Sequence, residues 1–283
     1  MDTRELNDIT SQMTTNHHYL LAQVIIWLTY LWWFYSMVLW AQSVPCMLTD
    51  VQKADHAETS ASLLTLFNKN PDKFISRFVT VDETWLHHFD PESKPQSTTW
   101  KHVTFPPPRK FHVFISACKV MSTVFWDSEG IVLIDYLEHD RSITGTYYAD
   151  LIRKCRAALK EKRRGKLWRS LLFHQDNASA HSSSQALTAV RNAGFEHLCH
   201  PLYSPDLAPS DFYLFPKLNE FMKGRKFADD DDATCTANDW LEDQEQEFFY
   251  NGIRALENHL TKCISVEENY VEKWQNIMLI FCC

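Results

Sequence analysis

Apolar residues between positions 78 and 137 occur in short runs that are rich in β-branched and aromatic side chains. The runs cover residues 78–81, 111–120, 121–126 and 131–137. Turn signals such as the Asp-Ser-Glu-Gly segment at 127–130 separate them. Runs of this length bounded by turn residues are typical of β-strands. The spacing of the runs fits three antiparallel strands, which we predict in this region.

A helical period replaces this pattern after residue 145. One apolar stripe at helical spacing consists of Tyr148, Leu151, Ile152, Cys155 and Leu159. Gly165 is the expected end of this helix. The elements predicted next are a strand at 171–173, a helix at 182–193 ending before Gly194, and a strand at 195–199. A further helix is predicted with Ser210 as its N-cap and with a bend or a restart at Pro216. Strands and helices in this order predict a mixed α/β sheet with helices packed on it.

The first 73 residues have a different character. Residues 19–41 are almost wholly apolar and carry no charge. This meets the length criterion for a membrane span of about 20 residues, but a buried helix or foreign sequence joined to a domain would have the same composition. Residues 42–73 look first helical and then loop-like, with a turn signal at 70–72, and are interpreted as a linker.

Composition excludes several classes of protein. Hydrophobic residues make up 45% of the 283-residue chain and charged residues 23%, as in ordinary globular proteins. The six glycines form neither a GxGxxG nor a GxxxxGK phosphate loop. The eight cysteines form no CxxC pair, which argues against a zinc ribbon or a thioredoxin motif.

Positive charge is concentrated in one segment, although the net charge is −8. The cations of this segment are Arg153, Lys154, Arg156, Lys160, Lys162, Arg163, Arg164, Lys166 and Arg169, and Glu161 is its one acidic residue. A charge run is often only a solvated helix face. The block is nonetheless dense enough to neutralise several DNA phosphates, and Arg163, Arg164 and Lys166 are the residues that we predict to contact DNA.

Three aspartates occupy positions where carboxylates can converge. Asp82 and Asp176 each follow an apolar strand, and Asp211 lies at the start of a predicted helix. An aspartate in such a position is more often structural than catalytic. If the three meet, they repel one another and raise one another's pKa, and divalent cations relieve that repulsion. Ligand oxygens with few His or Cys partners favour Mg²⁺ or Mn²⁺.

Long motifs surround these aspartates. They lie at residues 79–88 (VTVDETWLHH), 174–181 (HQDNASAH) and 203–215 (YSPDLAPSDFYLF), with shorter matches at 119–127, 143–148 and 161–163. Together they closely resemble the catalytic motifs of mariner-family DNA transposases, over about residues 74–274. Mariner enzymes have three Asp residues with 34 residues between the second and the third, and residues 177–210 of this chain number 34.

The resemblance implies an RNase H-like fold of the retroviral-integrase type and two Mg²⁺ or Mn²⁺ ions held by Asp82, Asp176 and Asp211. Asp82 would bridge both ions, and Glu83, His181 and Asp206 would be local supports. The implied reaction is hydrolysis at transposon ends, followed by attack of the 3′-hydroxyl on target DNA at TA dinucleotides. The implied partner is double-stranded DNA in the nucleus.

The N-terminal part departs from the family pattern. No paired helix-turn-helix pattern precedes the linker, and Ser43 and Cys46 stand where the family's linker motif has Trp and His. Because that motif supports dimer contacts in the family, a homodimer is an open question. We therefore divide the chain into an apolar segment at 1–41, a linker at 42–73 and a catalytic domain at 74–283. The alternatives to an active enzyme are an inactive or co-opted remnant that only binds DNA and a membrane-anchored protein.

Overall fold

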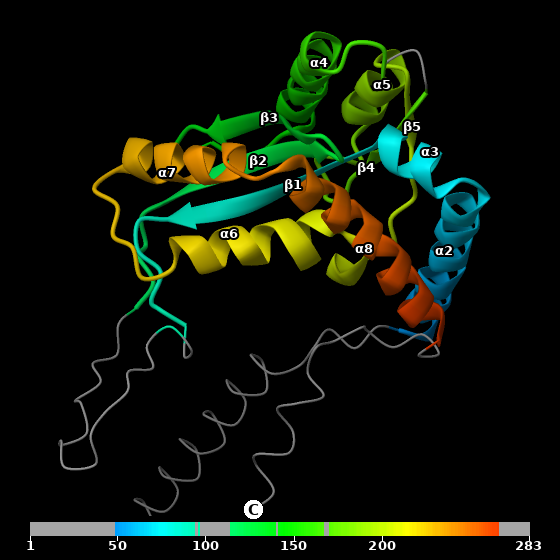
Figure 1. The fold of residues 1–283 in the computed structure, drawn as a ribbon. Helices are drawn as coiled ribbons and strands as arrows, with labels where there is room; N and C mark the ends of the chain where they lie inside the picture. The colour runs from blue at the N-terminus through cyan, green and yellow to red at the C-terminus, as the bar shows by residue number, and fades with distance from the viewer. Residues whose placement is uncertain (1–48, 94–95, 97–113, 140, 167–169, 266–283) are drawn as a thin grey trace, which may run out of the picture. The chain divides into compact units, whose positions relative to one another are not determined.

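A five-stranded mixed sheet forms the centre of the domain, with strand order β3-β2-β1-β4-β5 (Figure 1). The computed structural model describes residues 49–93, 96, 114–139, 141–166 and 170–265. The strands are β1 (Phe78–His87), β2 (Lys119–Asp127), β3 (Gly130–Leu137), β4 (Leu171–His174) and β5 (Phe195–His197). The first three strands pair antiparallel, as the sequence predicted, whereas β4 and β5 are parallel to β1. The predicted mixed α/β sheet is confirmed.

Two strand predictions need correction. The apolar run at 78–81 is only the first half of β1, which continues through Asp82 to His87. The predicted break after residue 120 does not exist, because β2 is one strand from Lys119 to Asp127. Residues 114–118 of the predicted run at 111–120 are not in a strand, and residues 111–113 lie outside the described residues. The two strands pair continuously from Val79–Asp127 to His87–Lys119, and this hydrogen-bonded ladder extends β1 through polar residues that the apolar pattern could not assign.

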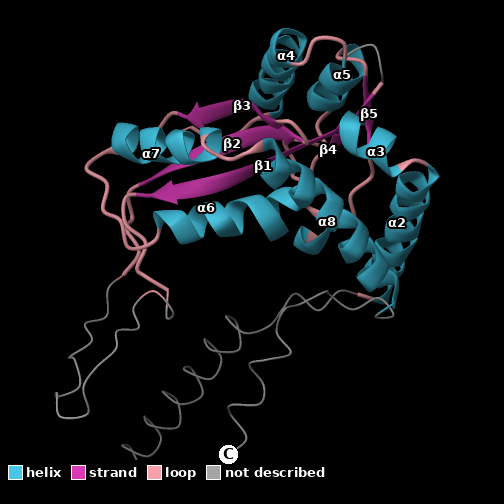
Figure 2. Cartoon of the chain, in the orientation of Figure 1, coloured by secondary structure: helices cyan, strands magenta, loops and turns pink. Residues whose placement is uncertain are grey.

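Side chains that alternate along the strands build a core on each face of the sheet. On one face, Val79, Val81, Phe125 and Phe173 pack against helices α4 (Gly145–Lys162) and α5 (Ser184–Asn192). All five residues of the apolar stripe predicted in α4 are fully buried there. Figure 2 shows α4 and α5 together on this side. The predicted helical stripe is therefore the contact face of α4.

The other face is covered by the remaining helices. Phe78, Val124, Trp126 and Leu172 pack against α3 (Pro71–Arg77), α8 (Gln246–Ser265) and the buried side of α2 (Asp50–Lys69). Helices α6 (Phe215–Met222) and α7 (Asp230–Glu242) cover the far end of β1 and β2 through Leu86 and Val120.

The described part of the segment interpreted as a linker is helical and packs on the domain. Thr49 and Gln52 form a capping box at the start of α2, and α2 lies along α8. Asn70 is the N-cap of α3, and its side chain accepts a hydrogen bond of 2.9 Å from the amide of Lys73. The turn signal at 70–72 therefore marks the junction of two helices.

The helix predicted after Pro209 begins with a wide π-helical turn, η3 (Ser210–Leu214), before α6. The prediction that Ser210 caps this helix is wrong, because its hydroxyl accepts a hydrogen bond of 3.0 Å from Trp126 Nε1 of β2. Pro216 stands in the first turn of α6, directly after the π-helical turn, where the sequence predicted a bend or a restart of the helix.

Among the helices that the structure describes, none is long and apolar enough to cross a bilayer. Residues 19–41, where the sequence raised a membrane span, lie outside the described residues.

Candidate active site

The three predicted aspartates come from three elements that meet where β4 ends beside the central strand β1. Asp82 lies in the middle of β1, Asp176 follows the end of β4, and Asp211 is the second residue of η3. The parallel register pairs Thr80 with His174, so Asp82 and Asp176 stand at corresponding heights on neighbouring strands. Besides burial, the charges of Asp211 and Asp176 raise the pKa of Asp82, the charge of Asp176 raises that of Asp211, and Asp82 is hydrogen-bonded to Asp211.

Asp82 and Asp211 form a closely coupled pair of carboxyl groups on the side of the sheet covered by α8. Burial, followed by the charges of Asp211 and Glu83, raises the pKa of Asp82 well above its usual range. Burial and the charges of Asp176 and Glu83 raise the pKa of Asp211 to about 6, although a hydrogen bond with Asp82 opposes this. The pair therefore retains a proton at a pH where isolated aspartates have lost theirs.

Asp176 has the opposite environment. Burial alone would raise its pKa, but His181 Nδ1 donates a hydrogen bond to Oδ1, and the resulting pKa is below the usual value. The amide of Ala178 donates a second hydrogen bond of 3.0 Å to the same oxygen. Asp176 is therefore fixed in its ionised form without any metal.

His181 joins Asp176 to Glu83 across the two strands. Its Nε2 lies 3.3 Å from Glu83 Oε1, and its side chain is only 2% exposed. Burial lowers its pKa, but the hydrogen bonds to Asp176 and Glu83 outweigh burial and raise the pKa to about 9. The ring packs against that of Tyr148, whose hydroxyl donates a hydrogen bond of 2.8 Å to Gln175 Oε1. The sequence interpretation had Glu83 and His181 as supports, but it missed Tyr148 and Gln175 because each resembles an ordinary core residue.

A pair of neutral histidines lies behind the loop that carries Asp176. His174 Nδ1 is 3.2 Å from Thr80 Oγ1, and His174 Nε2 is 3.1 Å from His200 Nδ1. Burial lowers the pKa of both rings, to about 4 for His200. Since the two rings are uncharged, they fix the end of β4 without adding positive charge beside the aspartates.

The donor set fits a divalent cation that completes its coordination with other oxygens. In the described part of the chain, no three Asp, Glu, His or Cys side chains converge closely enough to form a ready-made metal cluster. The Asp176 side chain is 42% exposed and Asp211 is exposed, so both can meet an ion and its waters. Mg²⁺ commonly binds through one or two carboxylates together with waters and substrate phosphates. The crowded Asp82–Asp211 pair supplies the negative charge that such an ion would neutralise.

Comparisons with known proteins agree with this geometry. A family model described as a transposase, partial DDE domain, matches residues 90–169, a stretch that contains none of the three aspartates. The human histone-lysine N-methyltransferase SETMAR is 30% identical over 231 residues, and the Mariner Mos1 transposase of Drosophila mauritiana is 26% identical over 239 residues. Each match covers 81% of this chain.

Solved structures of the Mos1 transposase share the fold. A pre-cleavage Mos1 transpososome aligns with a TM-score of 0.74 at 26% identity, covering 81% of this chain and 66% of that chain. A Mos1 paired-end complex with Mg aligns with a TM-score of 0.73 at the same identity and the same coverage of each chain. The Mos1 catalytic domain alone aligns at 0.68 and 25% identity, over 81% of this chain and 100% of that chain. The chain carries a mariner-family transposase catalytic domain.

This mariner-type domain has the RNase H-like fold that the sequence implied. The chain spans 33% of the length of the human relative and 66% of the length of the Mos1 transposase.

Two of the three cations predicted to contact DNA have a structural role in the mariner-type domain. Arg163 Nε and Lys166 Nζ lie 3.1 and 2.9 Å from Asp127 Oδ2, and the Asp127 side chain is fully buried. Both cations also pair with Glu129. Because a buried carboxylate needs such partners, Arg163 and Lys166 are engaged within the fold, and their contact with DNA stays a prediction.

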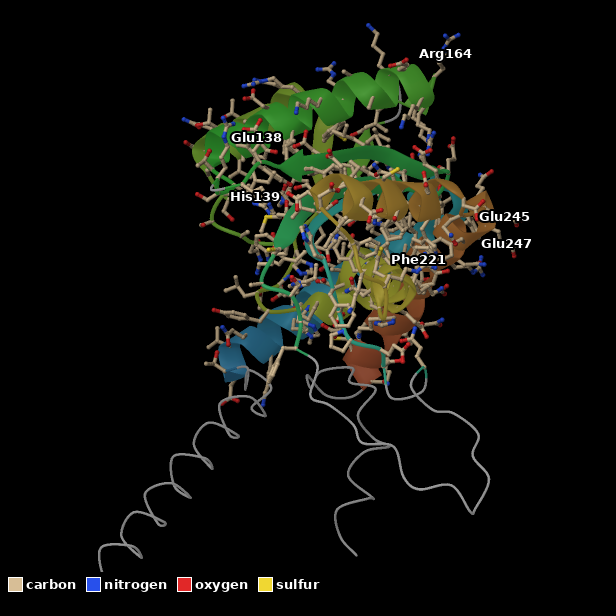
Figure 3. All side chains as sticks on the ribbon, turned by 90° about the vertical axis from the view of Figure 1, so that its left-hand side faces the viewer. Glu138, His139, Arg164, Phe221, Glu245 and Glu247 are labelled. Atoms are coloured by element: carbon tan, nitrogen blue, oxygen red, sulfur yellow. The ribbon has the colours of Figure 1, made fainter. Side chains whose placement is uncertain are left out.

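Arg164 differs from its two neighbours. It is exposed in the turn that follows the end of α4 (Figure 3). Further along α4, Arg153 pairs with Asp150, and Lys154 pairs with Asp135 at 2.6 Å. Much of the basic block is therefore already neutralised within the fold.

Proposed function

We propose that this chain is a metal-dependent DNA cleavage and strand-transfer enzyme of the mariner type. Asp82, Asp176 and Asp211 would hold two Mg²⁺ or Mn²⁺ ions, and Asp82 would be shared between them. The substrates would be double-stranded transposon ends and a TA target site in the nucleus, with a second copy of the chain as partner. The related Mos1 structures, which include a transpososome and a paired-end complex with Mg, support a role on DNA and the use of a divalent cation.

The observation that carries this proposal is the coupled Asp82–Asp211 pair beside Asp176. Two carboxyl groups forced together raise the free energy of the folded protein unless a proton or a cation intervenes. A purely structural site would not need this arrangement, and perturbed carboxyl groups of this kind cluster at functional sites.

The ions, when bound, would activate the attacking oxygen and stabilise the leaving oxygen of a phosphodiester. Asp82 and Asp211 would bind them as the pair loses its shared proton. Asp176 would bind as a carboxylate already ionised and oriented by His181. Because water and a 3′-hydroxyl attack phosphorus in the same in-line geometry, one set of carboxylates could serve both cleavage and strand transfer.

The test is Mn²⁺-dependent nicking of a supercoiled plasmid by the full chain, which needs no knowledge of the transposon end. The parent should nick, and Asp82→Asn, Asp176→Asn and Asp211→Asn should each lower the rate by about a thousandfold or more, while Glu245→Gln, a change at an exposed glutamate in the turn before α8, should not. If Asp211→Asn nicks at the parent's rate, the assignment of the three aspartates is wrong. A folded parent that does not nick would favour an inactive remnant that only binds DNA.

DNA binding by the outer end of α4 is the second part of the proposal. Arg164 remains the candidate phosphate contact among the three residues predicted from the sequence, since Arg163 and Lys166 are paired with buried Asp127. Lys160 and Lys162, also exposed on α4, would extend the same surface. Each phosphate contact should add to the salt dependence of binding.

A further inference from the structure

A buried polar cluster joins α2, α8 and the turn that precedes Asp211. It consists of His56 in α2, Ser60 in α2, Cys263 in α8 and Asp206 in the short helical turn Pro205–Leu207. His56, Ser60 and Cys263 are fully buried, and Asp206 is 8% exposed. The segments are far apart in the sequence, so the cluster exists only in the folded chain.

The contacts pass through the two nitrogens of one imidazole ring. His56 Nδ1 lies 2.8 Å from Cys263 Sγ, and His56 Nε2 lies 3.3 Å from Asp206 Oδ1. The hydroxyl of Ser60 donates a hydrogen bond of 3.2 Å to the same sulfur. Because the two contacts use the two different ring nitrogens, His56 bridges α8 and the turn.

The turn held by His56 is directly connected to Asp211. The amide of Ala208 bonds to Pro205 O, and the amides of Asp211 and Phe212 bond to Ala208 O at 3.0 and 3.1 Å. On its other side, the η3 turn is fixed by Trp126 through the hydroxyl of Ser210. Asp211 therefore lies in a wide turn that is fixed at two points, one in the sheet and one in α2.

Burying polar groups of this kind costs free energy unless they are hydrogen-bonded or paired, so the cluster calls for an explanation. Among the described residues, Asp206 Oδ2 is a buried oxygen without a hydrogen-bond partner, although its fellow oxygen is bonded to His56. Burial lowers the pKa of His56, but its contacts with Asp206 and Cys263 outweigh burial and raise the pKa to about 9. A protonated ring can donate toward Asp206 and balance its charge.

We infer that His56 is a positioning residue for the catalytic site: it fixes the Pro205–Leu207 turn and thereby the backbone that places Asp211 against Asp82. The role in catalysis rests on the proposed function. The role in ordering the turn does not, because it concerns the chain without metal or DNA. Helix α2 would thus be part of the active-site framework, although the sequence pattern suggests a linker.

The decisive experiment is hydrogen–deuterium exchange of the segment 204–214 in the full chain without metal. In His56→Gln, the amides of Ala208, Asp211 and Phe212 should exchange at least about tenfold faster than in the parent, because local opening of the turn becomes easier. The matched control is Leu63→Ala, a core change in the same helix that leaves the polar cluster intact. The control should speed exchange in α2 but leave segment 204–214 at the parent's rate. Equal exchange of that segment in His56→Gln and the parent would overturn the inference.

Milder variants separate the two contacts. Cys263→Ala removes the contact between His56 and α8 and should raise the exchange rate of segment 204–214 by a smaller factor than His56→Gln does. This variant also decides the question if His56→Gln does not fold. Asp206→Asn combined with His56→Gln should exchange no faster than His56→Gln alone, since both changes break the same contact. Fully additive effects would contradict the proposed connection.

The catalytic consequence has a separate readout. If the parent nicks plasmid DNA, His56→Gln should need about tenfold more Mn²⁺ for half-maximal rate, whereas Leu63→Ala should need the parent's concentration. An equal Mn²⁺ requirement in His56→Gln and Leu63→Ala would remove the link to catalysis. A parent that does not nick would overturn the proposed function, while the exchange data would still decide what His56 does.

Discussion

The two halves of the candidate active site differ in how the negative charges of their carboxyl groups are balanced. On the α4 side of β1, Glu83 and Asp176 are joined by the cationic ring of His181, which packs against Tyr148. On the α8 side, Asp82 and Asp211 are coupled through a shared hydrogen bond, and burial raises the pKa of each. One half is complete in the protein alone, whereas the other has excess negative charge that a proton or a cation must balance. The difference indicates which half responds to metal.

The largest expected effect comes from removing His181, the cation that joins Glu83 and Asp176. His181→Asn leaves Glu83 and Asp176 facing each other without His181, and should lower the free energy of unfolding of the metal-free protein by about 3 kcal/mol. Urea unfolding in EDTA measures this. His197→Gln, a change at an exposed histidine in β5, is the control and should stay within about 0.5 kcal/mol of the parent. Equal stabilities of the two variants would mean that His181 does not hold the two strands together.

The Asp82–Asp211 pair should make the stability of the metal-free protein depend on pH. The folded-state pKa of Asp211, about 6, is above its unfolded value, so the folded protein binds the proton more tightly. Stability from this group is fully present at low pH and is lost as pH rises from about 4 to about 6. Burial of its carboxyl group raises this pKa, but the residue as a whole is exposed, so solvent screens its charge and we expect a loss of about 1 kcal/mol over this window.

The measurement is urea unfolding in EDTA at pH 4 to 7 for the parent and for Asp211→Asn. The parent should lose stability relative to the variant as pH rises. A difference that grows in the opposite direction would mean that Asp211 has a stabilising cation partner.

The same contrast between paired and unpaired charges applies to the basic residues, with a smaller effect on DNA binding. Arg164→Ala should leave stability within about 0.5 kcal/mol of the parent and should reduce the salt slope of plasmid binding by about one. Arg163→Ala should instead destabilise the fold by about 2 kcal/mol, because Asp127 loses one partner inside the protein and keeps Lys166. Thermal unfolding and filter binding at several salt concentrations check both outcomes. A changed salt slope in folded Arg163→Ala with none in Arg164→Ala would reverse the assignment.

Local pattern predicted much of the fold, and motif resemblance singled out the three aspartates of the candidate site. The α4 stripe could be recognised because its five members are all buried on one helix face. Asp82, Asp176 and Asp211 could be chosen among many carboxylates only because the surrounding motifs resemble a family. Spacing alone carried no such information, since an aspartate after a strand is usually structural.

The rest depended on contacts between distant segments. The second half of β1 is a strand because it pairs with β2, although its own sequence is polar. Ser210 has the sequence context of a helix N-cap, but its hydroxyl accepts a hydrogen bond from Trp126, which lies 84 residues earlier in the chain. In the sequence alone, Arg163 and Lys166 resemble surface cations. In the fold, both pair with the buried carboxylate of Asp127. His56 in the predicted linker gave no signal, because its partner Asp206 lies 150 positions away.

The central claim is that the Asp82–Asp211 pair is destabilising until a divalent cation binds. Thermal unfolding of the full chain and of Asp211→Asn, in EDTA and in Mn²⁺, tests it most directly. We predict that Asp211→Asn is at least as stable as the parent in EDTA, because one repelling charge is gone. Saturating Mn²⁺ at about 100 times its Kd should stabilise the parent by about 2.7 kcal/mol and the variant by much less. A variant that is less stable than the parent in EDTA, or that keeps the full Mn²⁺ effect, would contradict the claim.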